Sequence, residues 1–372
     1  MCKLSDLCTF FSGGTPNSSN KDFYGGKIAF IRSGELHANK TELFVTQKGF
    51  ESSSAKMVDV GDLLLAMYGA TSGDIAISKI KGAINQAILC IRTKQNKKFI
   101  ESVWNKHVSK ILMKYLQGGQ GNLSTDIVKS LSFSFPTLAE QERIAKLMAL
   151  LDERISTQNK IIEDLKKLKC AIIENVLNNC HDNKMRLGDV GIYIRGLTYS
   201  SKDVVEQKGT IVMRSNNIVS GGMLDYCNNI VRVNKQISQE QQLQNGDIVI
   251  CMANGSSALV GKTSFYDGKC LSPITVGAFC GIYRSKMPIT KWLFQTNRYH
   301  RNIWNSLQGG NGAIANLNGE DILRMSFPTP DKSTIGHCIK LLSSLDLLIK
   351  NNVSLYAMFS QQKEYLLQQM FI

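Results

Sequence analysis

The stretch Phe135–Asn178, FPTLAEQERIAKLMALLDERISTQNKIIEDLKKLKCAIIENVLN, decides the organisation of this chain. After Pro136, and from Met148 onward, its apolar residues recur at alternating steps of three and four. This spacing is typical of a coiled-coil seam and is narrower than the apolar stripe of a globular surface helix. Glu140 places negative charge in the first turn, which favours a helix start there. We therefore expect one long helix of roughly 55–60 Å.

The same seam returns 194 positions later, after a second Phe-Pro pair that begins at Phe327. Its polar interruptions return with it, because Gln158 corresponds to Asn352 and Lys169 corresponds to Lys363. A shared seam with the same two polar interruptions indicates a duplication rather than two unrelated helices. The two helices should pair through these seams.

The segments before and between the helices also repeat one order of features. Each contains an arginine after an apolar run (Arg32 and Arg214), an apolar strand pattern after a Gly-Asp turn, and a Gln-Gly-Gly loop before the Phe-Pro pair. We predict an α+β fold with two similar globular domains of short strands, Gly-rich loops and a helix. Two long helices that form an antiparallel, pseudo-twofold coiled coil separate them. The expected boundaries are residues 1–135 and 181–327 for the globular domains, and 136–180 and 328–372 for the helices.

The polar positions in the seams suggest a register for the antiparallel pairing. If Lys169 faces Asn352 and Gln158 faces Lys363, every other layer is apolar on both sides. Polar residues in a seam disfavour slipped registers, because slippage buries them against apolar partners. We therefore predict these two polar layers.

Charge and composition bound the class of protein. The 372 residues carry a formal net charge of +14, with a pI near 9.3. A polyanionic partner such as nucleic acid is consistent with that charge, although a basic soluble protein without such a partner remains open. The ten cysteines contain no Cys-x-x-Cys pair, and Cys180-His181 has no partner at zinc spacing. We expect reduced thiols, no metal site, no membrane span and a cytoplasmic location.

Catalytic motifs are missing. The stretch Gly255–Thr263 resembles a phosphate-binding loop, but it has five residues between its glycines where the motif needs four. The six prolines include no adjacent pair, which removes the motif expected of an amino-methyltransferase. The five histidines show no metalloprotease spacing, and there is no nucleophile elbow. We expect no catalytic residue and no enzyme activity in this chain alone.

The junctions before the two helices carry a family resemblance. The first reads Pro-x-Leu-x-Glu-Gln-x-x-Ile from Pro136, followed by Leu-Asp-x-x-Ile from Leu151. The second keeps Leu-Asp-x-x-Ile at Leu345, but Thr329–Ser333 replaces the Leu-x-Glu-Gln segment. With the repeated domains, this pattern resembles the specificity subunit of type I restriction-modification systems (HsdS) over the whole chain.

The resemblance implies a function in DNA recognition. Each globular half would be a target recognition domain that reads one half of a bipartite, asymmetric double-stranded DNA site. The helices would be the central and C-terminal conserved regions, which set the spacing and dock two methyltransferase (modification) subunits. Restriction/translocase subunits would join that core, and S-adenosylmethionine, ATP and Mg²⁺ would belong to the partners. The alternative is a non-catalytic coiled-coil scaffold that does not read DNA, which leaves the duplicated basic domains unexplained.

Candidate DNA contacts are polar and basic residues of the loops, since such side chains read base edges and hold phosphates. In the first domain they are Arg32, Ser33, Lys40, Tyr68, Thr71, Ser72, Gln117, Gln120 and Asn122. In the second they are Arg214, Asn216, Asn217, Asn254, Ser256, Ser257, Lys262, Gln308 and Asn311. For each, the alternative is a solvated loop residue. Methyltransferase contacts or a solvated helix face are equally open for Glu153, Arg154, Lys160, Glu163 and Lys166.

Overall fold

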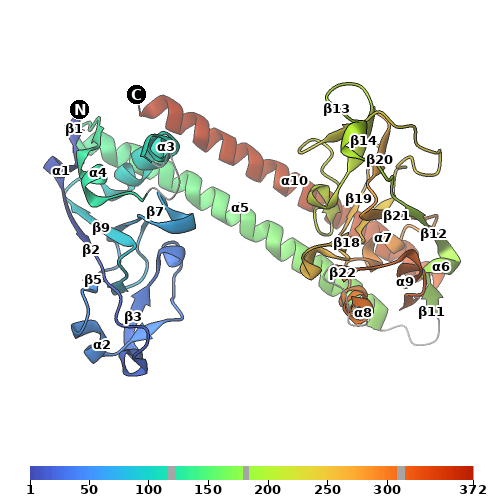
Figure 1. Ribbon diagram of the computed structural model, residues 1–372, viewed down its shortest axis with the longest axis horizontal. Helices are drawn as coiled ribbons and strands as arrows, with labels where there is room; N and C mark the ends of the chain where they lie inside the picture. Colours follow the sequence, from blue (N-terminus) through green and yellow to red (C-terminus); the bar gives the residue numbers. More distant parts are fainter. Residues whose placement is uncertain (116–121, 179–183, 308–314, 372) are drawn as a thin grey trace. The chain divides into compact units, whose positions relative to one another are not determined.

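The computed structural model describes residues 1–115, 122–178, 184–307 and 315–371. The chain divides into two compact units, of which one comprises residues 1–160 and 352–372 and the other residues 161–351. Each unit contains one globular domain together with a part of both long helices (Figure 1). Within the described residues, no helix has the length and hydropathy needed to cross a bilayer.

Two four-stranded sheets form the first domain. One is antiparallel and contains, in spatial order, β2 (Cys8–Ser12), β9 (Ile88–Thr93), β6 (Leu63–Ala66) and β7 (Ile75–Ile77). The other contains, in order, β4 (Phe44–Val45), β3 (Tyr24–Ile31), β8 (Gly82–Ile84) and β5 (Lys56–Val58). The apolar run of β6 is buried on both faces, since Leu63 and Leu65 join one core and Leu64 and Ala66 another.

The second domain repeats the central strands of this arrangement, with one strand added to one sheet and a different edge strand in the other. Its larger sheet contains, in order, β12 (Gly191–Arg195), β21 (Cys280–Ser285), β17 (Ile248–Cys251), β19 (Thr263–Phe265) and β15 (Gly222–Met223). Its other sheet contains β13 (Val204–Val205), β16 (Val231–Val233), β14 (Thr210–Met213) and β20 (Ile274–Val276). Strand β17 is buried on both faces as β6 is, with Ile248 and Ile250 in one core and Val249 and Cys251 in another.

In each domain, the first strand pairs with the last strand. The first domain pairs β1 (Cys2–Lys3) with β10 (Ser132–Phe133), and the second pairs β11 (Lys184–Arg186) with β23 (Ser326–Pro328). The domains therefore begin and end at one place, directly before a long helix. The remaining short helices are α1 (Leu4–Leu7), α2 (Gln47–Glu51), α4 (Thr125–Ser130), α6 (Leu187–Val190), α7 (Thr290–Leu293) and α9 (Gly319–Leu323).

A longer helix in each domain packs against the sheet that contains the buried central strand, β6 or β17. In the first domain this is α3 (Lys97–Tyr115), as the sequence predicts, and in the second it is α8 (Asn297–Leu307). Trp104 of α3 is buried and donates from Nε1 to the Gly73 carbonyl oxygen at 2.8 Å. Tyr299 of α8 donates its hydroxyl to the Gly261 carbonyl oxygen at the same distance. These two hydrogen bonds tie each helix to the loop that follows the buried central strand.

The two predicted long helices are α5 (Leu138–Asn178) and α10 (Lys332–Met370), and they run side by side in opposite directions in each unit (Figure 1). Their apolar residues join the domain cores: Met148 and Leu151 lie with Leu367 and Phe371 in the first unit, and Ile173 and Leu177 lie with Cys338 and Leu342 in the second. Residues later in α5 therefore pack against residues earlier in α10. The antiparallel pairing is confirmed.

The predicted register is wrong. Instead of facing Lys363, Gln158 donates from Nε2 to Asn352 Oδ1 at 2.5 Å. Lys169 does not face Asn352, because its amine lies 3.0 Å from Asp346 Oδ1. The reason is chemical, since a lysine removed from water gains more from a carboxylate than from a neutral amide. The two seam amides, which occupy the same position in the repeat, therefore pair with each other.

Candidate nucleic-acid interface

Three stretches of the first domain come together after the strands β3 and β6. His37, in the loop after β3, lies 2.9 Å from Asp74 Oδ1, measured from its Nε2. The backbone N–H of Leu123 donates to the Met67 carbonyl oxygen at 3.1 Å. We call residues 32–40, 67–74 and 122–125 the first loop cluster. It collects the candidate residues that lie within the described part of this domain.

Arg32 begins the first loop cluster but is already engaged within the chain. Its Nε and Nη2 donate to the two carboxylate oxygens of Glu35 at 3.2 and 3.0 Å, and its backbone N–H also donates to Glu35. Burial by itself raises the pKa of Glu35, but the hydrogen bonds from Arg32 outweigh it and the pKa is lowered. The Arg32 side chain is 51% exposed, so its outer edge faces solvent. Its charge is, however, partly neutralised by Glu35.

The other candidates of the first domain differ in exposure. Lys40 and Asn122 are exposed, whereas Ser33, Tyr68 and Thr71 are half-buried. Ser72 is half-buried as well, and its hydroxyl donates to the Met67 carbonyl oxygen at 3.1 Å, which serves the turn itself. Gln117 and Gln120 lie outside the described residues.

The second domain brings equivalent stretches together. Asn254 donates from Nδ2 to the Ser215 hydroxyl at 3.3 Å, and the Leu317 N–H donates to the Met252 carbonyl oxygen at 2.8 Å. The latter bond is the counterpart of the one between Leu123 and Met67. Strand β18 (Ala253–Asn254) also pairs with β22 (Ala315–Asn316). We call residues 214–217, 252–259 and 315–317 the second loop cluster.

Arg214 has the position of Arg32 but different surroundings. Asn217 stands three residues later, where the first domain has Glu35, and it accepts the Arg214 backbone N–H at 3.0 Å. The Arg214 side chain donates from Nη2 to the Asn229 carbonyl oxygen at 3.4 Å, and its buried Nε has no hydrogen-bond partner in the described chain. An unsatisfied buried donor costs free energy. Unlike Arg32, this guanidinium has no carboxylate among its described partners, so its charge is better placed to gain from an anionic ligand.

Asn217 is not available for base contacts. It is 1% exposed, and its side-chain amide donates to the carbonyl oxygens of Asp225 and Asn228 at 3.1 and 2.9 Å. Its role is to hold the loop that follows it. Asn216, Ser256 and Ser257 are exposed and Asn254 and Lys262 are half-buried, whereas Gln308 and Asn311 lie outside the described residues.

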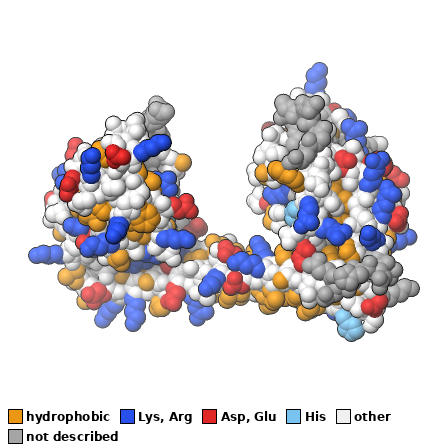
Figure 2. All heavy atoms as spheres, turned by 90° about the horizontal axis from the view of Figure 1, so that it is seen from below, with side chains coloured by type: hydrophobic (Ala, Val, Ile, Leu, Met, Phe, Trp, Pro, Cys, Tyr) orange, Lys and Arg blue, Asp and Glu red, His pale blue; other side chains and the backbone are white. Residues whose placement is uncertain are grey.

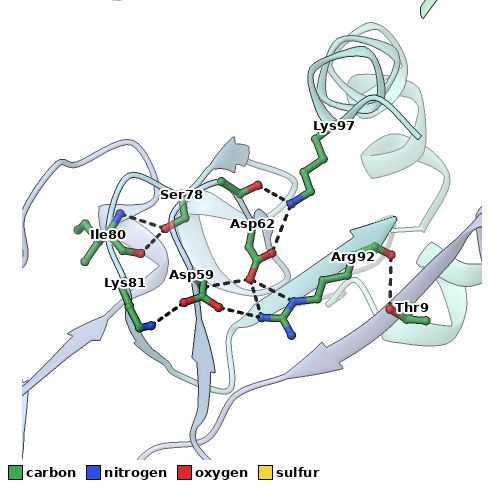
Figure 3. A network of polar contacts seen from close by, with 9 residues as sticks. Thr9, Asp59, Asp62, Ser78, Ile80, Lys81, Arg92 and Lys97 are labelled. Atoms are coloured by element: carbon green, nitrogen blue, oxygen red, sulfur yellow. Dashed lines mark hydrogen bonds and ion pairs between the residues drawn. The ribbon is translucent and has the colours of Figure 1, made fainter. Parts of the chain in front are cut away.

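Each central strand starts at an ion pair that the loop-residue pattern does not predict. Asp62, before β6, accepts from Arg92 Nη2 at 2.7 Å, and Lys97 Nζ lies 3.4 Å from its other oxygen (Figure 3). Burial is the largest single effect and raises the pKa of Asp62, but the hydrogen bonds from Arg92 and the Asp59 N–H, together with the charges of Arg92 and Lys97, outweigh it, so the pKa is lowered. In the second domain Arg284 Nη2 lies 2.7 Å from Asp247. The Gly-Asp pair, which recurs before both strands, was the signal in the sequence.

Basic side chains are spread over the visible face of each domain in Figure 2, among acidic and uncharged ones. The positive charge on that view is therefore not concentrated in a single patch. Among the described residues, no group of histidine, cysteine, aspartate and glutamate side chains is arranged to hold a metal ion. What the two clusters offer is a set of amide, hydroxyl and guanidinium groups, which suits hydrogen bonding to base edges and phosphates.

Comparison with known proteins defines the class of the first domain. Residues 1–167 match the family described as Type I restriction modification DNA specificity domain. A specificity subunit of the type I restriction enzyme MjaIX from Methanocaldococcus jannaschii is 25% identical over 184 residues, which cover 46% of this chain and 42% of that protein. The EcoKI specificity subunit of Escherichia coli is 27% identical over 181 residues, which cover 45% of this chain and 36% of that protein. The matches thus span less than half the length of these relatives.

Solved structures support the fold over the whole chain. The type I restriction-modification S subunit from M. genitalium has a TM-score of 0.61 at 14% identity, covering 100% of this chain and 95% of that one. A chain from a study of assembly and conformational transition of the type I R-M system has a TM-score of 0.51 at 13% identity, covering 99% and 96%. The predicted fold class is confirmed. The family match itself covers residues 1–167, that is, the first domain and most of α5.

Proposed function

We propose that this chain is the DNA sequence-specificity subunit of a type I restriction-modification complex, in which each globular domain reads one half of a bipartite site. The observation that carries this proposal is the duplicated loop cluster, built on equivalent strands and closed by equivalent hydrogen bonds. The two clusters differ in their exposed side chains, which supports an asymmetric site. The family of the first domain supports DNA as the ligand.

The proposal extends to partners. The long helices dock two methyltransferase subunits, and restriction/translocase subunits complete the complex. Apolar side chains that are exposed on α5 and α10 support a protein partner there: Leu147, Leu150, Ile161, Leu168, Leu341, Leu347, Leu348, Val353, Leu355 and Met358. The chain itself is non-catalytic and works in the cytoplasm. S-adenosylmethionine, ATP and Mg²⁺ are held by the partners.

Genomic methylation mapping tests the proposal. The chain is expressed with the methyltransferase encoded beside it, and methylated sites are compared with those of cells that lack only this chain. We expect a split, asymmetric methylated motif that disappears when the chain is deleted. Methylation that continues unchanged without the chain contradicts the proposal.

A further inference from the structure

Two equivalent polar junctions each join three elements. The first surrounds Asp152 of α5, which belongs to the first Leu-Asp-x-x-Ile motif. Its carboxylate lies 2.6 Å from Lys98 Nζ of α3 and 2.5 Å from Lys363 Nζ of α10. One aspartate thus connects a globular helix, its own long helix and the opposite long helix. Lys98 also pairs with Glu101, one helical turn further along α3.

The second junction exchanges the roles of the long helices. Here Asp346 of α10 supplies the carboxylate, and Lys169 Nζ of α5 lies 3.0 Å from it. From the globular domain, Lys291 Nζ of α7 approaches at 2.7 Å, and the indole Nε1 of Trp292 donates at 3.1 Å. Again one aspartate receives a lysine from the opposite long helix and a lysine from the globular domain. We call the two sets the lysine–aspartate junctions.

The positions show that the junctions were duplicated together with the domains. Asp346 follows Asp152 by 194 residues, and Lys363 follows Lys169 by the same number. Lys291 follows Lys98 by 193. Because each helix supplies an aspartate to one junction and a lysine to the other, the whole arrangement is encoded twice in the chain.

The junctions are partly withdrawn from water. Side-chain exposure is 32% for Asp152 and 16% for Asp346, and only 6% for Lys169. Burial alone raises the pKa of Asp152, but hydrogen bonds from Lys363 and Lys98 outweigh it, so the pKa is lowered and the carboxylate is charged. Asp346 shows the same balance, with burial outweighed by Lys291 and Lys169.

Partly buried ion pairs add more to specificity than to stability. Desolvation offsets much of the attraction, but a lysine or an aspartate left alone in the same place is costly. A slip of one residue along α5 moves a side chain by about 1.5 Å and turns it by about 100°. Either change separates the aspartate from both lysines, so each junction selects one register.

We propose that Asp152 and Asp346 are positioning residues for bipartite recognition, each holding its globular domain on the helix pair in one register, so that the length of the unread spacer depends on them. This inference rests on the proposed function. Neither aspartate belongs to a loop cluster, so the bases read in each half-site do not depend on them. A merely structural role changes stability but leaves the preferred spacer unchanged.

Full-length Asp152→Asn and Asp346→Asn variants test this, each expressed with the partner methyltransferase and assayed by genomic methylation mapping. We expect the same bases in both half-sites, with the preference for one spacer length over spacers one base pair longer or shorter reduced about tenfold. Asp164→Asn is the matched control, because Asp164 lies on the same helix in an exposed pair with Lys167. That control should keep the spacer preference of the wild type.

The outcomes separate this inference from the function on which it rests. A wild-type chain that directs no split motif refutes the proposed function. A split motif in the wild type, with the same spacer preference in both folded variants, overturns the positioning role alone. If the asparagine variants do not fold, Asp152→Glu and Asp346→Glu test the positioning role instead, because they keep the negative charge but displace the carboxylate. A spacer preference unchanged in these variants also overturns the inference.

Discussion

Arg32 and Arg214 occupy the same position in the two domains and differ in the side chain three residues later. Glu35 accepts from Nε and Nη2 of its arginine, whereas Asn217 leaves the Arg214 guanidinium without a carboxylate among its described contacts. A charge already paired with a carboxylate gains less from a phosphate or a guanine edge than one without such a partner. The two equivalent residues should therefore contribute unequally to DNA binding.

Substitution of the two arginines measures this inequality. We expect Arg214→Gln to weaken binding to the methylated motif about tenfold or more, consistent with the loss of one specific arginine contact. Arg32→Gln should weaken binding less, because Glu35 already offsets its charge. Fluorescence anisotropy with a labelled duplex gives both affinities, and Arg324→Gln is the control because its pair with Glu320 is exposed. Equal losses for Arg32 and Arg214 contradict the interpretation.

Asp62 makes the first domain sensitive to acid. Its pKa is lowered in the folded state, so its stabilisation is present above its unfolded pKa, near 4, and is lost as the pH falls through the folded value. We expect Asp62→Asn to lower the free energy of unfolding by about 1–3 kcal/mol at neutral pH, because Arg92 loses its buried partner. Urea unfolding at several pH values should show this difference shrinking toward acid pH. Asp126→Asn, in an exposed pair, should change stability by less than about 0.5 kcal/mol.

At the scale of single elements, two glycines set how closely the helices approach the sheets. Gly261 has φ +81°, and a Cβ on it would lie 2.6 Å from Ile303 of α8. Gly73 has φ +86°, and a Cβ there would lie 2.8 Å from Val108 of α3. Both carbonyls also accept the hydrogen bond from the facing helix. Glycine is needed there for conformation and for space together.

A comparison within the first domain separates these two requirements. At Gly69, an added Cβ has nothing within 4 Å, so Gly69→Ala is opposed only by the positive φ of that residue. This substitution should lower the free energy of unfolding by about 1–2 kcal/mol. Gly73→Ala adds overpacking against α3 and should cost about 1–3 kcal/mol more. Thermal or urea unfolding of the two full-length variants measures the difference. If both variants are destabilised equally, α3 shifts to accommodate the added methyl group at Gly73 without a loss of stability.

Helices and strands can be predicted from this sequence more reliably than the way in which they pair. The seam of three-and-four spacing locates α5 and α10, and the apolar runs after Gly-Asp locate β6 and β17, because burial periodicity is a local property. The register of the helix pair cannot be predicted from the same pattern. The pattern contains only the seam positions, and Asp152 and Asp346 flank the seam. Their recurrence beside Leu151 and Leu345 was the available signal.

Contact residues are harder to predict, because loop side chains serve the loop as often as a ligand. Asn217 and Asn216 are neighbours of the same chemical type, yet the first is buried in backbone hydrogen bonds and the second is exposed. No periodicity distinguishes them, since the difference arises from the path of residues 225–228 around Asn217. The sequence thus locates the loop clusters but not the side chains in them that face outward.

At the scale of the whole molecule, a net charge of +14 and two loop clusters should make the proposed DNA binding dependent on salt. Each phosphate neutralised by lysine or arginine releases a condensed counterion, so the logarithm of the binding constant falls linearly with the logarithm of salt concentration. Two domains that together contact six or more phosphates should lose about a thousandfold in affinity between roughly 50 and 200 mM salt.

We expect Arg214→Gln to make the slope of this salt dependence shallower by about one if its guanidinium contacts a phosphate. If the guanidinium contacts a base, the slope should stay unchanged and the specificity for one half-site should be relaxed. Titration of a labelled duplex that carries the methylated motif measures the slope, and a scrambled duplex of equal length measures the sequence-independent share. Affinity that does not change with salt argues against phosphate contacts in both domains, because counterion release is independent of the bases read.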